Sequence, residues 1–256
     1  MSDNDELLLS SERLDDLLTH DLKIIQSPEV FSFSMDAVLL ARFASVPAKG
    51  KVLDLCTGNG VVPLLLSTRT KATIDGVEIQ SRLADMAKRS VRLNGLHARV
   101  TIYEGDLRTF HQQSGYGGYD TVTVNPPYLP MGGGDRNANK HMEAARHEMH
   151  GTLDEIVTAC ARLVKSGGKV AMVHRPSRLI EIINSFTRAK LEPKRIRLVH
   201  PYAEAEANMV LIEAMRDAKP DVKVLPPLIV YNSKKEYNAE LMHIYYGDTR
   251  AGKKES

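Results

Sequence analysis

The stretch of the chain that most directly indicates chemistry is Asn125-Pro126-Pro127-Tyr128, which follows an apolar run at 119–124. Proline has a fixed φ and no backbone N–H, so two successive prolines form a rigid step whose carbonyl oxygens stay available as acceptors. An asparagine oxygen beside such a carbonyl can accept both hydrogens of one amino group, and a tyrosine ring can cover the flat molecule that carries it. The stretch therefore predicts a site that presents a planar amine to a reaction.

A second set of residues lies at the first strand-to-helix turn. Gly58 and Gly60 follow Asp54 there, and glycine permits tight backbone geometry and close approach of a ligand. A dinucleotide site would place a third glycine where Pro63 stands, and the acidic Asp54 would repel a pyrophosphate. The same carboxylate suits a ligand with a positive charge, such as an α-ammonium group.

Two further acids end the next two strand-like runs. Glu78 ends the second run, where an acid can accept hydrogen bonds from both ribose hydroxyls of a nucleoside. Asp106 follows Gly105 at the end of the third run and can accept a hydrogen bond from an adenine amino group. Ammonium, ribose and adenine in this order describe S-adenosylmethionine, so the spacing predicts this cofactor.

The elements that position these residues alternate between strands and helices. This alternation favours a mostly parallel sheet with helices on both faces, and ligands then bind at the carboxyl ends of the strands. We expect strands at 51–56, 72–79, 99–104, 119–124, 169–174, 195–200 and 208–215, and helices at 61–67, 80–94, 152–165 (with Thr152 as N-cap) and 177–190.

The whole chain has the composition of an ordinary globular protein. Of its 256 residues, 43% are hydrophobic and 26% are charged, and the net charge of +2 restricts any nucleic-acid contact to local basic patches. Two cysteines, Cys56 and Cys160, with no metal-ligand spacing indicate no metal site and a reducing compartment. No apolar run approaches the roughly 20 residues that span a bilayer. We therefore expect a cytoplasmic protein without membrane contact.

The chain divides into three expected parts. Residues 1–30 form an N-terminal extension, 31–247 a single catalytic domain, and 248–256 a disordered tail. The polar stretch that follows three glycines at 132–134 is expected to be a mobile loop. The oligomeric state stays open.

From Phe31 to Met215 the chain resembles class I S-adenosylmethionine-dependent methyltransferases of the Asn-Pro-Pro-Tyr group. Within that group it is most similar to bacterial enzymes that methylate the exocyclic N6 amine of an adenine in the anticodon loop of valine tRNA. Besides the motifs above, the resemblance includes Asp36-Ala37-Val38-Leu39-Leu40, Ala145-Arg146 and His174-Arg175-Pro176-Ser177-Arg178-Leu179. It departs from the family at Cys56, where many relatives carry glycine, and we expect only a slightly tighter turn there.

The resemblance implies a Rossmann-like, seven-stranded, mostly parallel sheet with an antiparallel last strand, and a tRNA substrate. It assigns catalysis to Asn125, Pro126 and Tyr128. The expected cofactor-binding residues are Phe33, Asp36, Asp54, Thr57, Gly58, Gly60, Glu78, Ile79, Asp106, Leu107 and Asn125. Basic residues that could contact RNA phosphates are Arg136, Lys140, Arg146 and Arg195.

Several alternatives remain open on the sequence. A planar amine is also found on glutamine, and glutamine methyltransferases of release factors carry the same four residues, usually with a helical domain before the sheet. Ribosomal RNA guanine and DNA adenine methyltransferases, a non-catalytic cofactor-binding module and a nicotinamide-dependent oxidoreductase are further possibilities. The bland interpretation of the Asn-Pro-Pro-Tyr stretch is a simple turn, and that of Asp54 is a helix cap.

Overall fold

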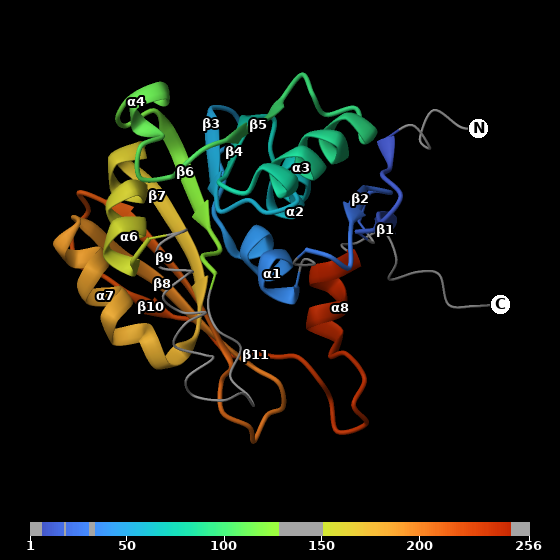
Figure 1. Ribbon diagram of the computed structural model, residues 1–256. Helices are drawn as coiled ribbons and strands as arrows, with labels where there is room; N and C mark the ends of the chain where they lie inside the picture. The colour runs from blue at the N-terminus through green and yellow to red at the C-terminus, as the bar shows by residue number, and fades with distance from the viewer. Residues whose placement is uncertain (1–6, 18, 31–33, 128–150, 247–256) are drawn as a thin grey trace, which may run out of the picture.

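A computed structural model describes residues 7–17, 19–30, 34–127 and 151–246, and its centre is a nine-stranded sheet flanked by helices (Figure 1). In chain order the strands of this sheet are β3 (Lys51–Leu55), β4 (Thr73–Glu78), β5 (Val100–Glu104), β6 (Tyr119–Val124), β7 (Val164–His174), β8 (Leu191–His200), β9 (Met209–Arg216), β10 (Lys223–Val224) and β11 (Leu228–Ile229).

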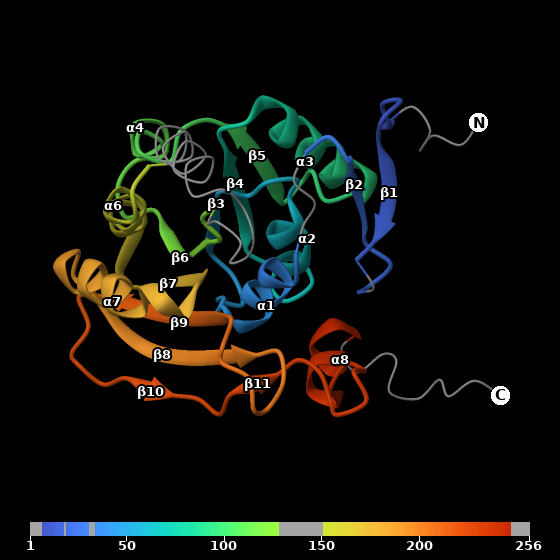
Figure 2. The same cartoon turned by 60° about the horizontal axis from the view of Figure 1, so that its bottom comes forward.

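The strands lie in the order β10-β8-β9-β7-β6-β3-β4-β5, which Figure 2 shows, and β11 also pairs with β8. The pairs β3 with β4, β3 with β6, β4 with β5 and β6 with β7 are parallel, whereas β9 runs antiparallel to both β7 and β8. Strands β3 to β9 confirm the expected seven-stranded sheet with an antiparallel last strand. The short strands β10 and β11, which the sequence did not indicate, pair in parallel with β8.

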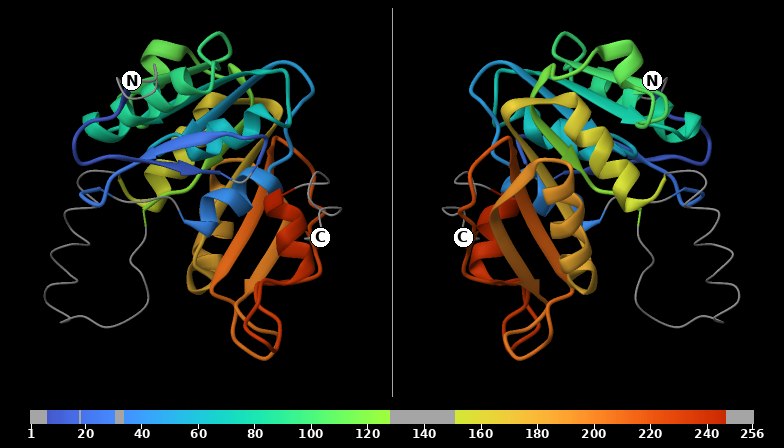
Figure 3. Two further views of the ribbon diagram at one scale, coloured as in Figure 1. Left: turned by 90° about the vertical axis from the view of Figure 1, so that its right-hand side faces the viewer. Right: turned by 90° about the vertical axis from the view of Figure 1, so that its left-hand side faces the viewer.

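Helices cover both faces of the sheet (Figure 3). They are α1 (Met35–Phe43), α2 (Val61–Ser67), α3 (Ser81–Leu93), α4 (His111–Ser114), α6 (Leu153–Leu163), α7 (Leu179–Arg188) and α8 (Ala239–Tyr246), with a 3-10 turn, η2 (Pro176–Arg178). Side chains of α1, α2 and α3, such as Leu40 and Leu65, join one buried cluster, and those of α6 and α7, such as Phe186, join another. Burying each such side chain contributes roughly 1.5–3 kcal/mol. Thr152 caps α6 in a reciprocal capping box with Glu155, which confirms the predicted N-cap.

An antiparallel hairpin of β1 (Arg13–Asp16) and β2 (Lys23–Gln26) packs on α3. The Asn94 side chain accepts from the Lys23 backbone N–H (2.9 Å) and donates to its carbonyl (2.7 Å), while the Ser90 hydroxyl accepts from the Ile25 N–H (3.0 Å). These side chains satisfy backbone groups of β2 that no neighbouring strand pairs. The expected extension at 1–30 therefore packs against the helices where the structure describes it.

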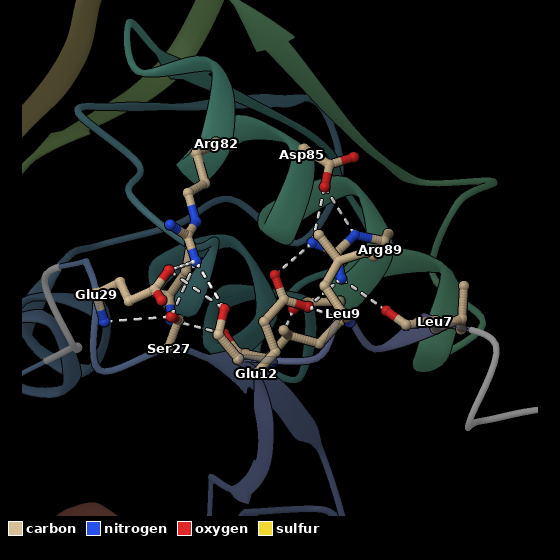
Figure 4. A network of polar contacts seen from close by, with 12 residues as sticks. Leu7, Leu9, Glu12, Ser27, Glu29, Arg82, Asp85 and Arg89 are labelled. Atoms are coloured by element: carbon tan, nitrogen blue, oxygen red, sulfur yellow. Dashed lines mark hydrogen bonds and ion pairs between the residues drawn. The ribbon is translucent and has the colours of Figure 1, made fainter.

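A polar network fixes the first described residues to the exposed side of α3 (Figure 4). Arg89 donates to Glu12 (Nη2 to Oε1, 2.8 Å) and to Asp85 (Nε to Oδ2, 2.8 Å), and the Glu12 side chain is fully buried. Two turns earlier on the same helix, Arg82 pairs with Glu29 (2.6 Å). The hydrogen bond from Arg89 is the main cause that holds the pKa of Glu12 below its usual value.

Two strands begin earlier than the sequence predicts. Strand β7 starts at Val164, directly after α6, and runs through Gly167 and Gly168, which were expected to follow a longer helix. At Gly168 a Cβ atom would lie 3.0 Å from the Asp120 carbonyl oxygen, so close strand contact explains that glycine. Strand β8 starts at Leu191 and accommodates Pro193 beside a register shift.

Candidate active site

The candidate site lies between β3 and β6. From β3 the chain adds β4 and β5 on one side of the sheet, and it then adds β6 and β7 on the other side. β3 and β6 are parallel neighbours, with Leu55 paired to Val124, and their following helices α2 and α6 cover opposite faces. A crevice opens at such a switch point, at the carboxyl ends of the strands. Cys56 and Asn125, each one residue beyond that pair, therefore lie at adjacent strand ends.

Asp54 lies beneath this crevice and is fully buried. Its two carboxylate oxygens accept hydrogen bonds from the Thr57 and Thr123 hydroxyls, each at 2.6 Å. Burial raises the pKa of Asp54 to about 7 against the lowering effect of the two hydroxyls. In the structure the carboxyl group thus positions the glycine loop through Thr57, and its contact with a ligand ammonium stays a prediction.

Space for the Thr57 side chain depends on Gly76 in the neighbouring strand β4. A Cβ atom at Gly76 would lie 3.0 Å from the Thr57 hydroxyl oxygen and 2.8 Å from a methyl carbon of Ile102. The glycine inside this strand therefore marks a close approach of the loop to the sheet. It is a positioning residue that the sequence reasoning missed, although an isolated glycine in a strand is a recognisable signal.

The loop between β3 and α2 contains three left-handed residues. At Gly58 (φ 57°) no atom of the described residues lies within 4 Å of an added Cβ, whereas at Gly60 (φ 92°) that atom would lie 3.1 Å from the Cβ of Ala87 on α3. Gly58 thus leaves open space above the loop, and Gly60 allows α2 and α3 to pack closely. Cys56 also has a left-handed φ of 57°, so the turn there is not merely tighter: a side chain in this conformation costs about 1 kcal/mol.

A small pocket lies at the carboxyl ends of β3, β4 and β5, and we call it the nucleoside pocket because it contains residues expected to bind the ribose and the adenine of the cofactor. It is lined by Cys56, Val77, Glu78, Ile79, Gly105, Asp106 and Leu107. The Glu78 carboxylate accepts from the backbone N–H groups of Gly58 and Gln80, both at 2.9 Å, and is 3% exposed. Burial raises the pKa of Glu78, while these backbone donors oppose the rise. The lining combines the apolar side chains of Ile79 and Leu107 with the acids Glu78 and Asp106. Contact of these residues with an adenine and a ribose stays a prediction.

The second of these acids, Asp106, has an unexpected partner. Arg108 donates to both oxygens of Asp106 through its guanidinium (Nε to Oδ2, 2.8 Å), and its backbone N–H donates to Oδ1 (2.8 Å). Contact of Asp106 with an adenine amino group therefore stays a prediction. Arg108 fixes the orientation of that carboxylate, and its place two residues after Asp106 gave no signal for this role.

The second part of the site, which we call the acceptor end, lies at the carboxyl ends of the neighbouring strands β6 and β7. Asn125 is half-buried and Pro126 is buried, and His174 ends β7 two residues beyond the pair that links Val124 to Met172. The His174 Nδ1 accepts the backbone N–H of Arg175 at 2.8 Å, so the ring proton lies on Nε2. Burial, and then nearby cations, lower the pKa of His174 to about 4, which keeps it neutral at pH 7.

Asp36, in the first turn of α1, faces this same end. Burial raises its pKa, and the charge of Arg175 opposes that rise. Arg175 also donates to the carbonyl oxygen of Asn208 at 2.9 Å, which links the end of β7 to the start of β9. His174 and Arg175 belong to the resembling segment but had no assigned role, and the structure places them beside Asn125 and Pro126.

Comparison with known proteins agrees with this geometry. The family model of the methyltransferase small domain matches residues 21–186. The chain belongs to the methyltransferase small-domain family. A tRNA1(Val) (adenine(37)-N6)-methyltransferase from Aeromonas hydrophila is 32% identical over 185 residues, which cover 71% of this chain and 75% of that protein. A protein of the same name from Parabacteroides distasonis is 27% identical over 182 residues, covering 70% and 74%. This methyltransferase is therefore an enzyme.

Solved structures show the same fold. A protein from Agrobacterium tumefaciens described as a predicted O-methyltransferase superposes with a TM-score of 0.67 at 22% identity, covering 82% of this methyltransferase and 95% of that chain. Geranyl diphosphate C-methyltransferase from Streptomyces coelicolor superposes with a TM-score of 0.52 at 13% identity, covering 71% and 78%. Both confirm the expected class I methyltransferase architecture.

Arg195, one of the expected RNA-binding residues, has structural contacts in this methyltransferase. Its guanidinium donates to Glu213 (3.0 Å) and to the Phe43 carbonyl (2.6 Å) and lies 4.5 Å from the centre of the Phe43 ring. Glu213, 2% exposed, also accepts from the Ser45 N–H at 2.7 Å. These contacts join β8 and β9 to α1 and give no support to an RNA role.

Three further basic residues lie close to Arg195 in sequence. β8 runs in the direction of β7, since both are antiparallel to β9. Arg188, Lys190 and Lys194 therefore lie near its start, at the edge opposite the site. Arg188 pairs with Asp154 at 2.6 Å.

Five predicted site residues, Phe33, Tyr128, Arg136, Lys140 and Arg146, lie outside the described residues, as does the stretch expected to be a mobile loop. Within the described part of the chain, no three His, Cys, Asp or Glu side chains are grouped to hold a metal ion. Among those same residues, no helix is long and apolar enough to cross a membrane.

Proposed function

We propose that this enzyme transfers a methyl group from S-adenosylmethionine to the exocyclic N6 amine of an adenine in tRNA, at position 37 of tRNA1(Val). The observation that carries the proposal is the placement of Asn125 and Pro126 at the strand end adjacent to Cys56, whose side chain lines the nucleoside pocket. The names of the relatives support the choice of tRNA and of adenine.

The described residues fit the cofactor part by part. Glu78 in the nucleoside pocket is suited to accept ribose hydroxyls, and Asp106 in the same pocket is suited to accept the adenine amine. Open space above Gly58 admits the rest of the molecule, and the acidic character of this edge favours its positive charge. When bound, S-adenosylmethionine supplies a methyl group made electrophilic by its sulfonium.

The chain itself contributes mainly positioning. The Asn125 side-chain oxygen and the Pro126 carbonyl accept the two hydrogens of the adenine amine, which directs the nitrogen lone pair out of the ring plane. Holding reactants in such a geometry removes much of the barrier of a bimolecular step. The new nitrogen–carbon bond forms before the amine loses its proton, so no general base is needed earlier. Neutral His174 is suited to donate a hydrogen bond from Nε2 at the acceptor end and is not suited to accept a proton.

The proposal is tested by incubating the enzyme with labelled S-adenosylmethionine and, separately, total tRNA, ribosomal RNA, DNA and protein, followed by nucleoside and amino-acid analysis. We expect N6-methyladenosine in tRNA. Asn125→Ala is expected to reduce turnover at least about 100-fold, because the amine is no longer oriented. Cofactor affinity, measured by calorimetry, is expected to change less than about twofold, since Asn125 does not line the nucleoside pocket.

The matched control is Asn184→Ala, which removes an exposed asparagine on α7 and is expected to leave turnover unchanged. Label in protein glutamine with none in RNA would overturn the proposal in favour of the glutamine-amide alternative. Near wild-type turnover by Asn125→Ala would show that the amine is oriented by other groups.

A further inference from the structure

Four tyrosine rings form a row in the carboxyl-terminal part of the chain. Tyr202 lies 5.4 Å from Tyr231, Tyr231 lies 5.3 Å from Tyr237, and Tyr237 lies 6.3 Å from Tyr245, measured between ring centres. The angles between successive ring planes are 32°, 18° and 12°. The two pairs that contain Tyr237 are stacked, and Tyr202 is tilted against Tyr231 at the end of the row.

The row is built from the residues after β8, from a tight turn and from α8, which follows that turn. Tyr231 and Tyr237 pair across a tight turn whose residue Lys235 has a φ of 63°. This turn is fixed to the end of β8, because the Tyr231 N–H donates to the carbonyl of Pro201 at 2.9 Å. Tyr202 follows directly, and Tyr245 comes from α8.

The row lies at the same edge of the sheet as the acceptor end of the site. β8 runs in the direction of β6 and β7, so Tyr202, just after its last residue, lies beyond the carboxyl ends of these strands. Figure 1 shows β11 and α8 at the end of the sheet toward which β6 and β7 point. α8, which carries Tyr245, packs against α1, which carries Asp36. Burial, then Tyr237 and then Asp36 raise the pKa of Tyr245.

Two members of the row are open to solvent. Tyr202 is 39% exposed and Tyr237 is 47% exposed. If these large rings served only to pack α8 onto the domain, we would expect them to be buried. Lys234 and Lys235 are exposed in the turn between the central tyrosines, and the structure records no ion pair for either among its described residues. The nearest acids in sequence are engaged, since Glu236 accepts from Asn232 (3.0 Å) and Glu240 pairs with Arg197.

We propose that this tyrosine row is a stacking surface for unpaired nucleobases of the RNA substrate, next to the target adenine, with Lys234 and Lys235 contacting its phosphates. Exposed aromatic faces with flanking cations are the features by which proteins bind single-stranded nucleic acid, because every base has a stacking face. The row lies outside residues 21–186, which the family model matches. The inference rests on the proposed function, since it presumes an RNA substrate.

The test compares Tyr202→Ala and Tyr237→Ala with Tyr202→Phe and Tyr237→Phe. Binding of an unmodified tRNA1(Val) transcript is measured by filter retention, and kcat and KM for the same transcript are measured under saturating S-adenosylmethionine. Loss of one stacking face is expected to raise the Kd and KM for RNA about tenfold with kcat nearly unchanged. The Phe variants keep the ring and are expected to bind like wild type.

The matched control is Tyr116→Ala, which removes a tyrosine that is 69% exposed and lies shortly before β6 begins, at the opposite edge of the sheet. It is expected to leave RNA binding unchanged. A second readout places 2-aminopurine beside the target adenine. Its fluorescence is expected to be quenched by wild type and by the Phe variants, and to recover with the Ala variants.

The inference is overturned if both Ala variants keep the wild-type melting temperature and the wild-type Kd and KM for RNA. Should an Ala variant unfold, Lys234→Gln with Lys235→Gln replaces it, and an unchanged RNA Kd then contradicts the proposal. Failure of the proposed function is seen separately, because the wild-type enzyme would then methylate no RNA before any variant is compared.

Discussion

Replacing the buried Asp54 by asparagine is expected to make the enzyme more stable at alkaline pH and to weaken its cofactor binding. The carboxyl group is fully buried with two hydroxyl partners, and burial raises its pKa from 3.8 to about 7. Between these two values the folded state holds a proton that the unfolded state has lost, so the stability of the wild type falls as pH rises. The substituted asparagine side chain cannot ionise, so the variant escapes this loss.

The size of the effect follows from the two pKa values. One pKa unit corresponds to about 1.4 kcal/mol, so the gap in free energy of unfolding between Asp54→Asn and wild type is expected to widen by roughly 2.5 kcal/mol from pH 5 to pH 8. Urea unfolding at several pH values measures this gap. Thr123→Val, which removes one hydrogen-bond donor to the carboxyl, is expected to raise its pKa further and steepen the fall in stability.

The affinity for S-adenosylmethionine is also expected to depend on the ionisation of Asp54. A cation bound near the carboxyl ends of β3 and β4 favours the ionised form of Asp54, so the affinity of wild type for S-adenosylmethionine is expected to rise from pH 6 to pH 8. Asp54→Asn is expected to lose this dependence. A gap in stability that stays constant with pH, together with unchanged cofactor affinity, would refute the reasoning.

Two further variants test the elements that support the site. Arg89→Met is expected to lower the free energy of unfolding by about 3 kcal/mol, because the fully buried Glu12 carboxylate loses its cation, whereas Asp85→Asn at the exposed end of the same network is expected to cost under about 1 kcal/mol. Equal losses in urea unfolding would contradict this account. Gly60→Ala is expected to cost about 2 kcal/mol and to weaken cofactor binding, since φ is 92° and the new methyl meets Ala87; an unchanged melting temperature would count against it.

The sequence indicated the parallel sheet and its strand-end residues because both depend on local signals. Asp54, Glu78, Asp106 and Asn125 each follow a short apolar run, and a parallel sheet gathers such positions at one edge. The direction of β8 could not be deduced in the same way. Arg195 was expected as a possible RNA contact, and its bonds to Glu213 and to the Phe43 carbonyl could not be read from the sequence.

What the sequence did not indicate depends on contacts between distant residues. The fit of Thr57 against Gly76 joins a loop to a neighbouring strand, and the hydrogen bonds of Asn94 with β2 join segments 71 residues apart. The tyrosine row likewise joins the end of β8, a turn and α8, none of which has a periodic pattern. Such contacts are decided by packing and not by local preference.

The central claim is that the amine-binding residues act on adenine 37 of tRNA, and one measurement tests it most directly. An unmodified tRNA1(Val) transcript and a counterpart with guanine at position 37 are incubated with enzyme and S-adenosylmethionine, digested to oligonucleotides, and analysed by mass spectrometry. The account predicts one added methyl group, on the anticodon-loop fragment containing adenine 37, and none in the guanine counterpart. Methylation of both transcripts to the same extent, or of neither, would contradict it.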